Sequence, residues 1–377
     1  MSTVARNADY TKEYNRKLVL RLLRHQPMSR AEIARRTGLT RACTSLIAAE
    51  LLNDGAVREM APVGGQRGRT PTPLMLCSDA GYAIGIYLNR DGCTAGVVDI
   101  TGNILAQERV RMDDEGERLS LLETAINKLL RESGIPMEHF CGIGISAPGP
   151  LDGESGKILN PPRFSLWNQV EIGAILQART GLPVYLENNA TCLAGYHYGR
   201  PESCGSENFL LLLVDSGIGS GVISKGKLLK GAGYFTSELG HTSINFRGRP
   251  CECGNIGCLE AYAAIPKLLK DTGFHTWKQV IDALEVSEDA GRLITLEAEY
   301  LSTAIVNLTN LICIDSVLLA GDLLYGAEHI AAEMERIINT RSLYAECKPL
   351  RVLASSNAAG IKLLAAADIA FTRALTV

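Results

Sequence analysis

A similar arrangement of apolar strands occurs twice in this 377-residue chain, and this repetition limits the possible folds more than any other feature. The first copy starts at Gly81 with "GYAIGIYLNRDGCTAGVVDITGNILAQERV", and the second starts at Asn208 with "NFLLLLVDSGIGSGVISKGKLLKG". Each copy consists of consecutive strands separated by turn residues. Helices and strands are expected to alternate after each copy. The pattern therefore predicts two related α/β lobes with a cleft between them.

The segments after the two copies supply the alternating elements. A helix over 119–132, a buried strand "CGIGISAPG", a helix near 170–180 and a strand "PVYLEN" follow the first copy. After Cys258 the chain is predicted to be mainly helical, with a late strand in "SVLLAGDL" and a final helix from Ala358. The first lobe is assigned 74–190 plus about 358–377, and the second lobe is assigned 191–357.

The front of the chain differs in charge from the rest. Residues 1–73 contain 13 Lys and Arg and 6 Asp and Glu, a net charge of +7, whereas residues 74–377 carry −10. A basic front segment on an acidic body is typical of a nucleic-acid-binding domain joined to another domain. A first helix in this segment is expected to bury Tyr14, Leu18 and Leu22.

Two further helices joined by a tight turn are predicted in "MSRAEIARRTGLTRACTSLIAAELLNDGAV". Ser29 and Glu32 form a candidate capping box, Gly38 supplies the positive φ that ends the helix, and Thr40 caps the next helix. That second helix is expected to stop at Gly55. Its predicted buried residues are Cys43, Ile47 and Leu51. Two helices around a glycine-containing turn are typical of a helix-turn-helix.

The segment "AVREMAPVGGQRGRTPTPLML" predicts two short strands around a glycine-rich tip, which is a wing. In a winged helix-turn-helix the start of the second helix enters the major groove. Arg41 is the expected base-specific contact, because Arg donates two hydrogen bonds to guanine. A solvated basic loop is the alternative for the two arginines at the tip. The full set of predicted DNA contacts is Arg30, Arg35, Arg36, Thr40, Arg41, Thr44, Ser45, Arg67 and Arg69.

Three of the eleven cysteines lie within eight residues. Cys251, Cys253 and Cys258 have the spacing C-x-C-x4-C, and His241 lies ten residues upstream. Three thiolates and one imidazole are a common ligand set of structural zinc, and all four positions would be filled by protein. Three inert thiols beside a surface histidine are the alternative.

The segment "SELGH", followed by nine residues and "CECGNIGCLEAYA", resembles the signature of the ROK family (repressors, open reading frames and kinases). The resemblance extends from about Gly81 to Ala374. It implies a two-lobed, actin-like body of the sugar-kinase, RNase H-like type, with one structural zinc per chain on the three cysteines and His241. The winged helix-turn-helix is the part that the repressor branch has and the kinase branch lacks.

Two requirements of a sugar kinase are missing. The family's kinases have an Asp as the base in an E-N-D motif, and Asn189 stands there in "LENNAT". An amide does not accept the proton of a sugar hydroxyl. The first phosphate loop, D-I-G-G-T in the kinases, is replaced by 87–91, "YLNRD". The second loop, "DSGIGSG", keeps three glycines, which serve either a phosphate cradle or a strand turn. No enzymatic activity is therefore expected.

The residues that hold sugar hydroxyls in the family are better preserved. By resemblance these are Asn188, Glu238, His241 and Glu260, with Asn189 as a further candidate contact. One ring nitrogen of His241 is expected to bind zinc while the other donates to a sugar. Solvated surface acids are the alternative for Glu238 and Glu260. Asn160 and Trp167 in "NPPRFSLW" are weaker candidates.

The sequence therefore predicts a sugar-responsive DNA-binding regulator, with repression as the expected sign. A sugar or sugar phosphate would release it from operator DNA, which it would bind as a homodimer or homotetramer. An active ATP-dependent sugar kinase with a DNA-binding head is one alternative, and a regulator that responds to a protein partner is another. The absence of an apolar run of about 18 residues and of an export signal predicts a cytoplasmic protein with reduced thiols.

Overall fold

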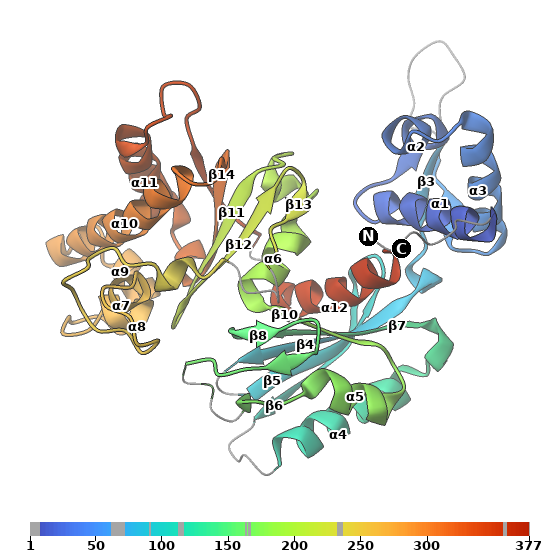
Figure 1. The fold of residues 1–377 in the computed structure, drawn as a ribbon, viewed down its shortest axis with the longest axis horizontal. Coiled ribbons are helices and arrows are strands. Elements are labelled where there is room, and N and C mark those ends of the chain that lie inside the picture. The colour runs from blue at the N-terminus through green and yellow to red at the C-terminus, as the bar shows by residue number, and fades with distance from the viewer. Residues whose placement is uncertain are drawn as a thin grey trace. The chain divides into compact units, whose positions relative to one another are not determined.

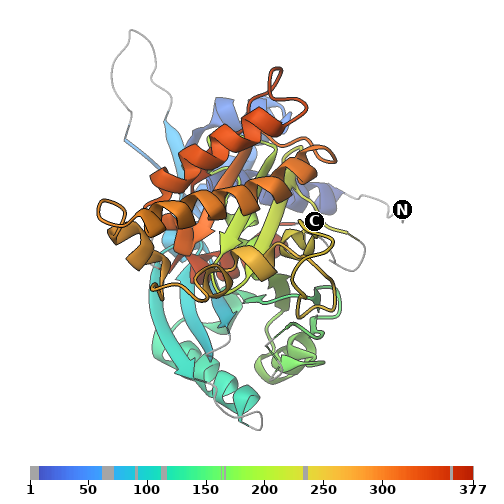
Figure 2. The same ribbon diagram turned by 90° about the vertical axis from the view of Figure 1, so that its left-hand side faces the viewer.

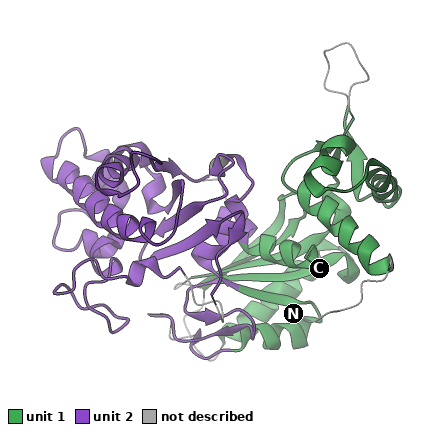
Figure 3. Ribbon diagram, turned by 45° about the horizontal axis from the view of Figure 1, so that its top comes forward, with its two compact units in different colours: residues 1–146, 171–186, 366–377 green, residues 147–170, 187–365 purple. Residues whose placement is uncertain are grey.

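The computed structural model describes residues 8–61, 72–89, 92–111, 117–162, 164, 167–231, 237–356 and 360–376. The chain forms two compact units, which Figure 3 shows in different colours. Unit 1 consists of Met1–Ser146, Glu171–Leu186 and Ala366–Val377, and unit 2 consists of Ala147–Val170 and Glu187–Ala365.

The front of unit 1, which we call the head, contains three helices and a small sheet (Figure 1). Strand β3 lies between β1 and β2 and is antiparallel to both. The sheet of the head extends to Leu76, three residues past the predicted boundary at 73. The elements of the head are α1 (Ala8–Leu23), β1 (Met28–Ser29), α2 (Arg30–Thr37), α3 (Arg41–Asn53), β2 (Val57–Glu59) and β3 (Pro73–Leu76).

The predicted caps Ser29, Gly38 and Thr40 are confirmed, whereas α3 ends at Asn53, two residues before the predicted Gly55. Ser29 Oγ accepts a hydrogen bond from the backbone N–H of Glu32 at 3.2 Å, and Thr40 Oγ1 accepts one from the N–H of Cys43 at 3.2 Å. Gly38 ends α2 with φ 72°. Each cap satisfies an N–H group that has no partner inside its helix.

The predicted buried face of α1 is wrong by one residue. Val19 and Leu23 are 1 % and 4 % exposed, whereas Tyr14 is 39 % exposed. In α3 the buried residues include Ile47 and Leu51 as predicted, but Cys43 is only half-buried. Apolar residues of α1 occupy adjacent stripes about 100° apart, so their spacing alone does not select the stripe that packs inward.

The larger sheet of unit 1 has the strand order β10-β7-β4-β5-β6. Strands β4, β5 and β6 are successively antiparallel, and β7 is parallel to β4. The elements are the 3₁₀ turn Ser78–Ala80, β4 (Tyr82–Asn89), β5 (Gly92–Asp99), β6 (Ile104–Arg111), α4 (Arg118–Ser133), the 3₁₀ turn Met137–His139, β7 (Phe140–Ala147), α5 (Ile172–Thr180), β10 (Val184–Asn188) and α12 (Ile361–Ala374).

The sheet of unit 2 repeats this order as β13-β12-β11-β14-β15. Strands β11, β12 and β13 are antiparallel, and β14 and β15 join in parallel. The predicted duplication is therefore confirmed. The elements are β8 (Leu151–Asp152), β9 (Lys157–Ile158), α6 (Asn189–His197), β11 (Phe209–Val214), β12 (Ile218–Ser224), β13 (Lys227–Leu228), α7 (Glu260–Ala263), α8 (Ile265–Leu268), α9 (Trp277–Asp282), α10 (Glu288–Thr309), β14 (Ser316–Gly321), α11 (Ala327–Arg341) and β15 (Arg351–Ala354), with 3₁₀ turns at Pro201–Ser203, Leu239–His241 and Asp322–Leu324.

The core of unit 2 lies between its sheet and its helices. Every residue of β11 is buried, and α10 and α11 run side by side over the sheet (Figure 2). Residues of β11, β14, α10 and α11 belong to one apolar cluster. This buried sheet positions the loops at its edge. Within the described ranges, no helix is both long and apolar enough to cross a membrane.

Candidate functional sites

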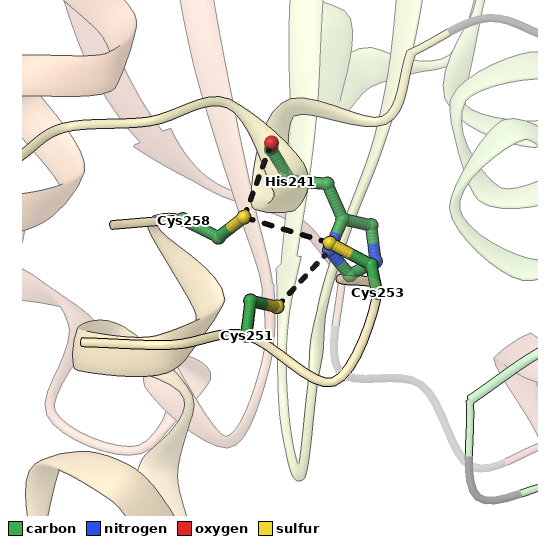
Figure 4. Close-up of side chains that lie close together, drawn as sticks. All are labelled: His241, Cys251, Cys253 and Cys258. Carbon is green, nitrogen blue, oxygen red and sulfur yellow. Dashed lines mark hydrogen bonds between the residues drawn. The ribbon is translucent and has the colours of Figure 1, made fainter. Parts of the chain in front are cut away.

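The four predicted metal ligands lie together in unit 2. One possible ligand atom from each of His241, Cys251, Cys253 and Cys258 lies within 4.8 Å of the others. Cys251 Sγ is 3.6 Å from His241 Nδ1, and Cys253 Sγ is 3.7 Å from Cys258 Sγ (Figure 4). His241 belongs to a 3₁₀ turn, and the cysteines lie on the loop before α7. The predicted cluster that could hold a metal ion is confirmed.

These distances can be compared with a tetrahedral ion. Zinc bonds of about 2.3 Å to sulfur and about 2.0 Å to nitrogen, at tetrahedral angles, separate two sulfurs by about 3.8 Å and a sulfur from a nitrogen by about 3.5 Å. The two measured separations match these values. Burial raises the pKa of the Cys258 thiol to about 12, so an ion that binds there must displace a proton.

The loop needs its glycines to bring the thiols together. Gly254 and Gly257 have φ 91° and 75°. A Cβ on Gly257 would lie 1.8 Å from the carbonyl oxygen of Asn245. The backbone of Gly257 also donates to Arg249 O at 2.7 Å and accepts from Ile244 N at 2.8 Å. The cysteine loop is therefore held by backbone contacts that a side chain at position 257 would break.

The end of the cysteine loop leads directly into Glu260, the first residue of α7. Glu260 Oε2 accepts a hydrogen bond from the N–H of Ile218 at 2.9 Å. Ile218 starts β12 just after the turn of the "DSGIGSG" segment. The carboxylate of Glu260 therefore joins the cysteine loop to this glycine-containing segment.

The carboxyl group of Glu238 lies near the other predicted pocket residues. Desolvation raises the pKa of Glu238, the charge of Glu260 raises it further, and His241 lowers it. The residue keeps a solvent-exposed surface. Since His241 Nδ1 faces the thiols, its Nε2 is the ring nitrogen available to a ligand.

Asn188 and Glu238 both approach the backbone of Gly149. A Cβ at Gly149 would lie 2.9 Å from Asn188 Nδ2 and 2.9 Å from Glu238 Oε1. Asn188 Oδ1 caps α6 by accepting from the N–H of Ala190 at 2.9 Å. Asn189 is the first residue of α6 and is half-buried. Carboxylate and amide groups that converge at a site of this kind suit a hydroxylated ligand.

Several features of this region were missed from the sequence. Gly149 admits the two side chains, and Glu187 is 5 % exposed in β10 and forms an ion pair with Lys230. A carboxylate inside the buried strand "PVYLEN" was an available signal for a charged partner. Trp167 does not fit the predicted sugar contact, because it is 1 % exposed and stacks on Phe164 at 6.3 Å.

The glycines of the "DSGIGSG" segment allow close packing of β12 on α6. A Cβ on Gly221 would lie 2.7 Å from Ala190 O and 2.7 Å from Ala194 Cβ, and one on Gly219 would lie 3.0 Å from Ala190 Cβ. These two glycines lie inside β12. The sequence left open whether these glycines form a phosphate cradle or serve the local chain conformation. The structure favours the second interpretation, because the glycines allow the strand to pack closely on the helix.

Acidic groups occupy the loop that precedes those glycines. Asp215 Oδ2 is 2.9 Å from Lys362 Nζ, and Asp215 Oδ1 accepts from Asp322 N at 3.0 Å. Burial, followed by the charge of Asp215, raises the pKa of Asp322. A phosphate bound here would meet two carboxyl groups and one ammonium group.

The start of α3 presents three of the predicted DNA contacts on the surface. Thr40, Arg41 and Ser45 are exposed. Thr44 is 1 % exposed and donates its hydroxyl to Thr40 O at 3.1 Å. The prediction for Thr44 is therefore wrong, because its side chain faces the interior of the head.

The basic residues of α2 differ in their availability. Arg35 and Arg36 are exposed and lie 3.7 and 3.2 Å from Glu32 Oε1, whereas Arg30 is paired with Glu59 at 2.8 Å. Exposed ion pairs of this kind contribute little to stability, so breaking them costs little free energy. Arg67 and Arg69 at the predicted wing tip lie outside the described residues.

The duplicated sheets and the His/Cys loop define the class of two-lobed α/β proteins with an actin-like sugar-kinase body. The chain belongs to the ROK family, whose model matches residues 83–372. The xylose repressor of Caldicellulosiruptor bescii is 31 % identical over 371 residues, which cover 92 % of each chain. The DNA-binding transcriptional dual regulator NagC of Escherichia coli is 27 % identical over 362 residues, with 90 % of this chain and 88 % of that protein covered.

Solved structures share the fold. A ROK family transcriptional regulator described as a homolog of the E. coli MLC protein superposes with a TM-score of 0.78 at 22 % identity, over 97 % of this chain and 98 % of that chain. The ROK hexokinase of Thermus thermophilus superposes with a TM-score of 0.63 at 27 % identity, over 78 % of this chain and 98 % of that chain.

Proposed function

We propose that this protein is a DNA-binding transcriptional regulator that responds to a sugar or sugar derivative, with repression as its sign. The observation that carries the proposal is the extent of the similarity: the regulator fold covers 97 % of the chain, and a named xylose repressor covers 92 %. The matched hexokinase covers 78 %.

The head is the proposed DNA-binding domain, a winged helix-turn-helix. Its support is the capped pair α2 and α3, the antiparallel strands β2 and β3, and the exposed start of α3. Arg41 is proposed to contact a base, with Thr40 and Ser45 beside it, while Arg35 and Arg36 contact phosphates. We further propose that a homodimer or homotetramer binds a two-fold operator, as is usual for helix-turn-helix proteins.

The sugar pocket is proposed to lie in unit 2 beside Asn188, Glu238, His241 and Glu260, with Asn189 as a further contact. One support is that the carboxyl group of Glu238 interacts electrostatically with His241 and Glu260. Another is that the side chains of Asn188 and Glu238 both approach Gly149. Zinc is the proposed ion, because three thiolates and an imidazole are its common structural ligands and two of their separations, 3.6 and 3.7 Å, match a tetrahedral ion. It would hold His241 and Glu260 in place.

Phosphoryl transfer is not part of the proposed function. Asn189 provides an amide where a base is needed, and residues 87–91 lack the glycines and the acid of the first phosphate loop. The body is therefore proposed to bind its ligand without turning it over.

Fluorescence anisotropy on the DNA upstream of the protein's own gene tests the proposal. The assay is run at fixed salt with and without a panel of sugars and sugar phosphates, since salt alone changes DNA affinity strongly. Specific binding that one sugar releases is the expected result. Specific binding that no sugar changes would favour a protein signal, and the absence of specific binding would favour the kinase alternative.

The variant Glu260→Ala tests the pocket in the same assay. Loss of hydrogen bonds to a charged group is expected to weaken the effector response by about 10- to 100-fold, with operator affinity unchanged. Glu252→Ala, an exposed acid of the same loop, is the matched control. A Glu260→Ala variant that releases DNA at the wild-type effector concentration would contradict the pocket assignment.

A further inference from the structure

An ion pair joins the head to the last helix of the chain. Arg24 follows α1 directly, and its backbone N–H donates to Leu20 O at 3.0 Å, so it continues the last turn of that helix. Arg24 Nη2 lies 2.7 Å from Asp368 Oδ1, in the middle of α12. Both residues belong to unit 1, although 344 positions separate them in the sequence.

The pair is well shielded from solvent. The side chains of Arg24 and Asp368 are 9 % and 14 % exposed, whereas those of the head pair Lys12 and Glu50 are 60 % and 41 % exposed. The Arg24 guanidinium lies 4.8 Å from the ring centre of Phe371. Removing one member of a shielded pair leaves an uncompensated charge, whereas an exposed pair contributes little.

Helix α12 is a firm support for this contact. Gly144 in β7 has no side chain, and a Cβ there would lie 1.9 Å from Ala366 O and 3.4 Å from Ala370 N. The backbone of α12 therefore packs directly on β7 inside unit 1. The head is consequently attached by Arg24 to an element of the body that has little room to shift independently of its sheet.

The same helix also makes a contact on the pocket side. Near its start, in unit 2, Lys362 pairs with Asp215 at 2.9 Å. Three residues after Asp215, Ile218 donates its N–H to Glu260 at 2.9 Å. One continuous helix thus bears both the ion pair with the segment next to the candidate sugar pocket and the ion pair with the head.

We propose that Arg24 and Asp368 form the contact that couples effector binding to DNA binding. The pair holds the head in one orientation on α12, and a ligand at Glu260 changes the stability of that orientation through Ile218, Asp215 and Lys362. The two are positioning residues that touch neither DNA nor effector. This inference rests on the proposed function, because coupling requires both sites and two states of the molecule.

Variants of the full chain test the coupling. Asp368→Asn keeps the shape of the side chain and removes its charge, Arg24→Gln removes the other charge, and the double variant Arg24→Asp with Asp368→Arg restores the pair in reverse. Lys12→Gln, in the exposed pair of the head, is the matched control. For each variant, operator affinity is measured with and without the effector found for the wild type, and effector affinity is measured without DNA.

In the wild type we expect the effector to weaken operator binding at least about 10-fold, within the usual range of allosteric coupling. In Asp368→Asn and Arg24→Gln the ratio of operator affinity without effector to operator affinity with effector should fall to about twofold or less. The affinity for the effector should be retained. The reversed pair should recover much of the ratio, and Lys12→Gln should keep it. A purely structural role would lower stability without this selective loss and recovery.

The outcomes separate the inference from the proposed function. If no effector releases the wild type, the proposed function fails and the coupling fails with it. If the wild type responds and the folded single variants respond equally well, the coupling alone is overturned. Should the charge variants misfold by circular dichroism, Lys362→Gln replaces them, since it breaks the more exposed ion pair with Asp215 on the proposed route. An unchanged ratio of operator affinities without and with effector in that variant would then overturn the proposal.

Discussion

At the scale of single residues, Glu297 has the least usual environment. It is 0 % exposed in the middle of α10, where Leu293 and Leu301 on adjacent turns belong to the core of unit 2. Neither carboxyl oxygen has a hydrogen-bond partner among the described residues. Burial raises the pKa of Glu297 well above its ordinary value. The native state therefore favours the protonated, neutral side chain.

This protonation gives stability a definite dependence on pH. Since the folded pKa exceeds the unfolded one, the contribution of Glu297 is fully present below the unfolded pKa and is lost as pH rises through the folded pKa. Glu297→Gln cannot ionise. The difference in free energy of unfolding between this variant and the wild type should be larger at about pH 8 than at about pH 4, in favour of the variant. The increase should exceed about 1 kcal/mol, since one pKa unit corresponds to 1.36 kcal/mol. Urea unfolding at both pH values measures the difference.

Glu299→Gln is the control for this measurement, because Glu299 is exposed on the same helix. Its stability relative to wild type should change little between the two pH values. Equal pH dependence in wild type and Glu297→Gln would show that the carboxyl group is ionised in the folded protein.

Residue-level predictions from the sequence succeeded where the interaction is local. Ser29, Gly38 and Thr40 act on backbone groups within four positions, so the sequence alone contained the whole interaction. The burial of Thr44 and Trp167 depends on which helix face and which loop turn inward. Neither choice is decided by neighbouring residues.

At the scale of elements, the cysteine loop was the most predictable part of the candidate site. Its ligand spacing and its glycines lie within eight residues, apart from His241. The contacts of Gly149 and of the pair Glu187 and Lys230 were not predictable, because they join segments distant in the chain. Both lobes were predictable as elements, since each strand carries its own apolar pattern.

Removal of the metal should act on this loop and spare the head. Cys258→Ser is expected to lower zinc affinity more than about 100-fold, since even changes outside the ligand set cost 10- to 100-fold. Elemental analysis should show about one zinc per wild-type chain and a loss in the variant. The sugar response should disappear with the metal, because the loop holds His241 and Glu260, while operator affinity remains.

Cys347→Ser, at an exposed cysteine of unit 2, is the matched control and should retain the metal. Zinc affinity of the wild type should also fall as pH is lowered, because the thiol of Cys258 must release its proton. Full zinc content in Cys258→Ser would exclude this residue as a ligand.

At the scale of the whole molecule, phosphoryl transfer would need contributions from several parts of the chain. Asn189, predicted to stand at the position of the base, begins α6 and carries an amide instead of a carboxylate. Leu88, predicted to lie at the position of the first phosphate loop, is 0 % exposed in β4. Gly219 and Gly221 serve the packing of β12 on α6. Restoring a single group therefore leaves the other requirements unmet.

We accordingly expect no sugar-dependent ADP formation by the wild type, and none by Asn189→Asp. The substitution supplies a carboxylate but leaves the replaced first phosphate loop unchanged. A coupled ADP assay with a panel of hexoses measures this, with the Thermus thermophilus ROK hexokinase as positive control. Hexose-dependent ADP release by the wild type, increased by Asn189→Asp, would make the protein an enzyme. It would also mean that the body of this chain phosphorylates the sugar that it binds. DNA binding by the head would then depend on this reaction and not on sugar binding alone.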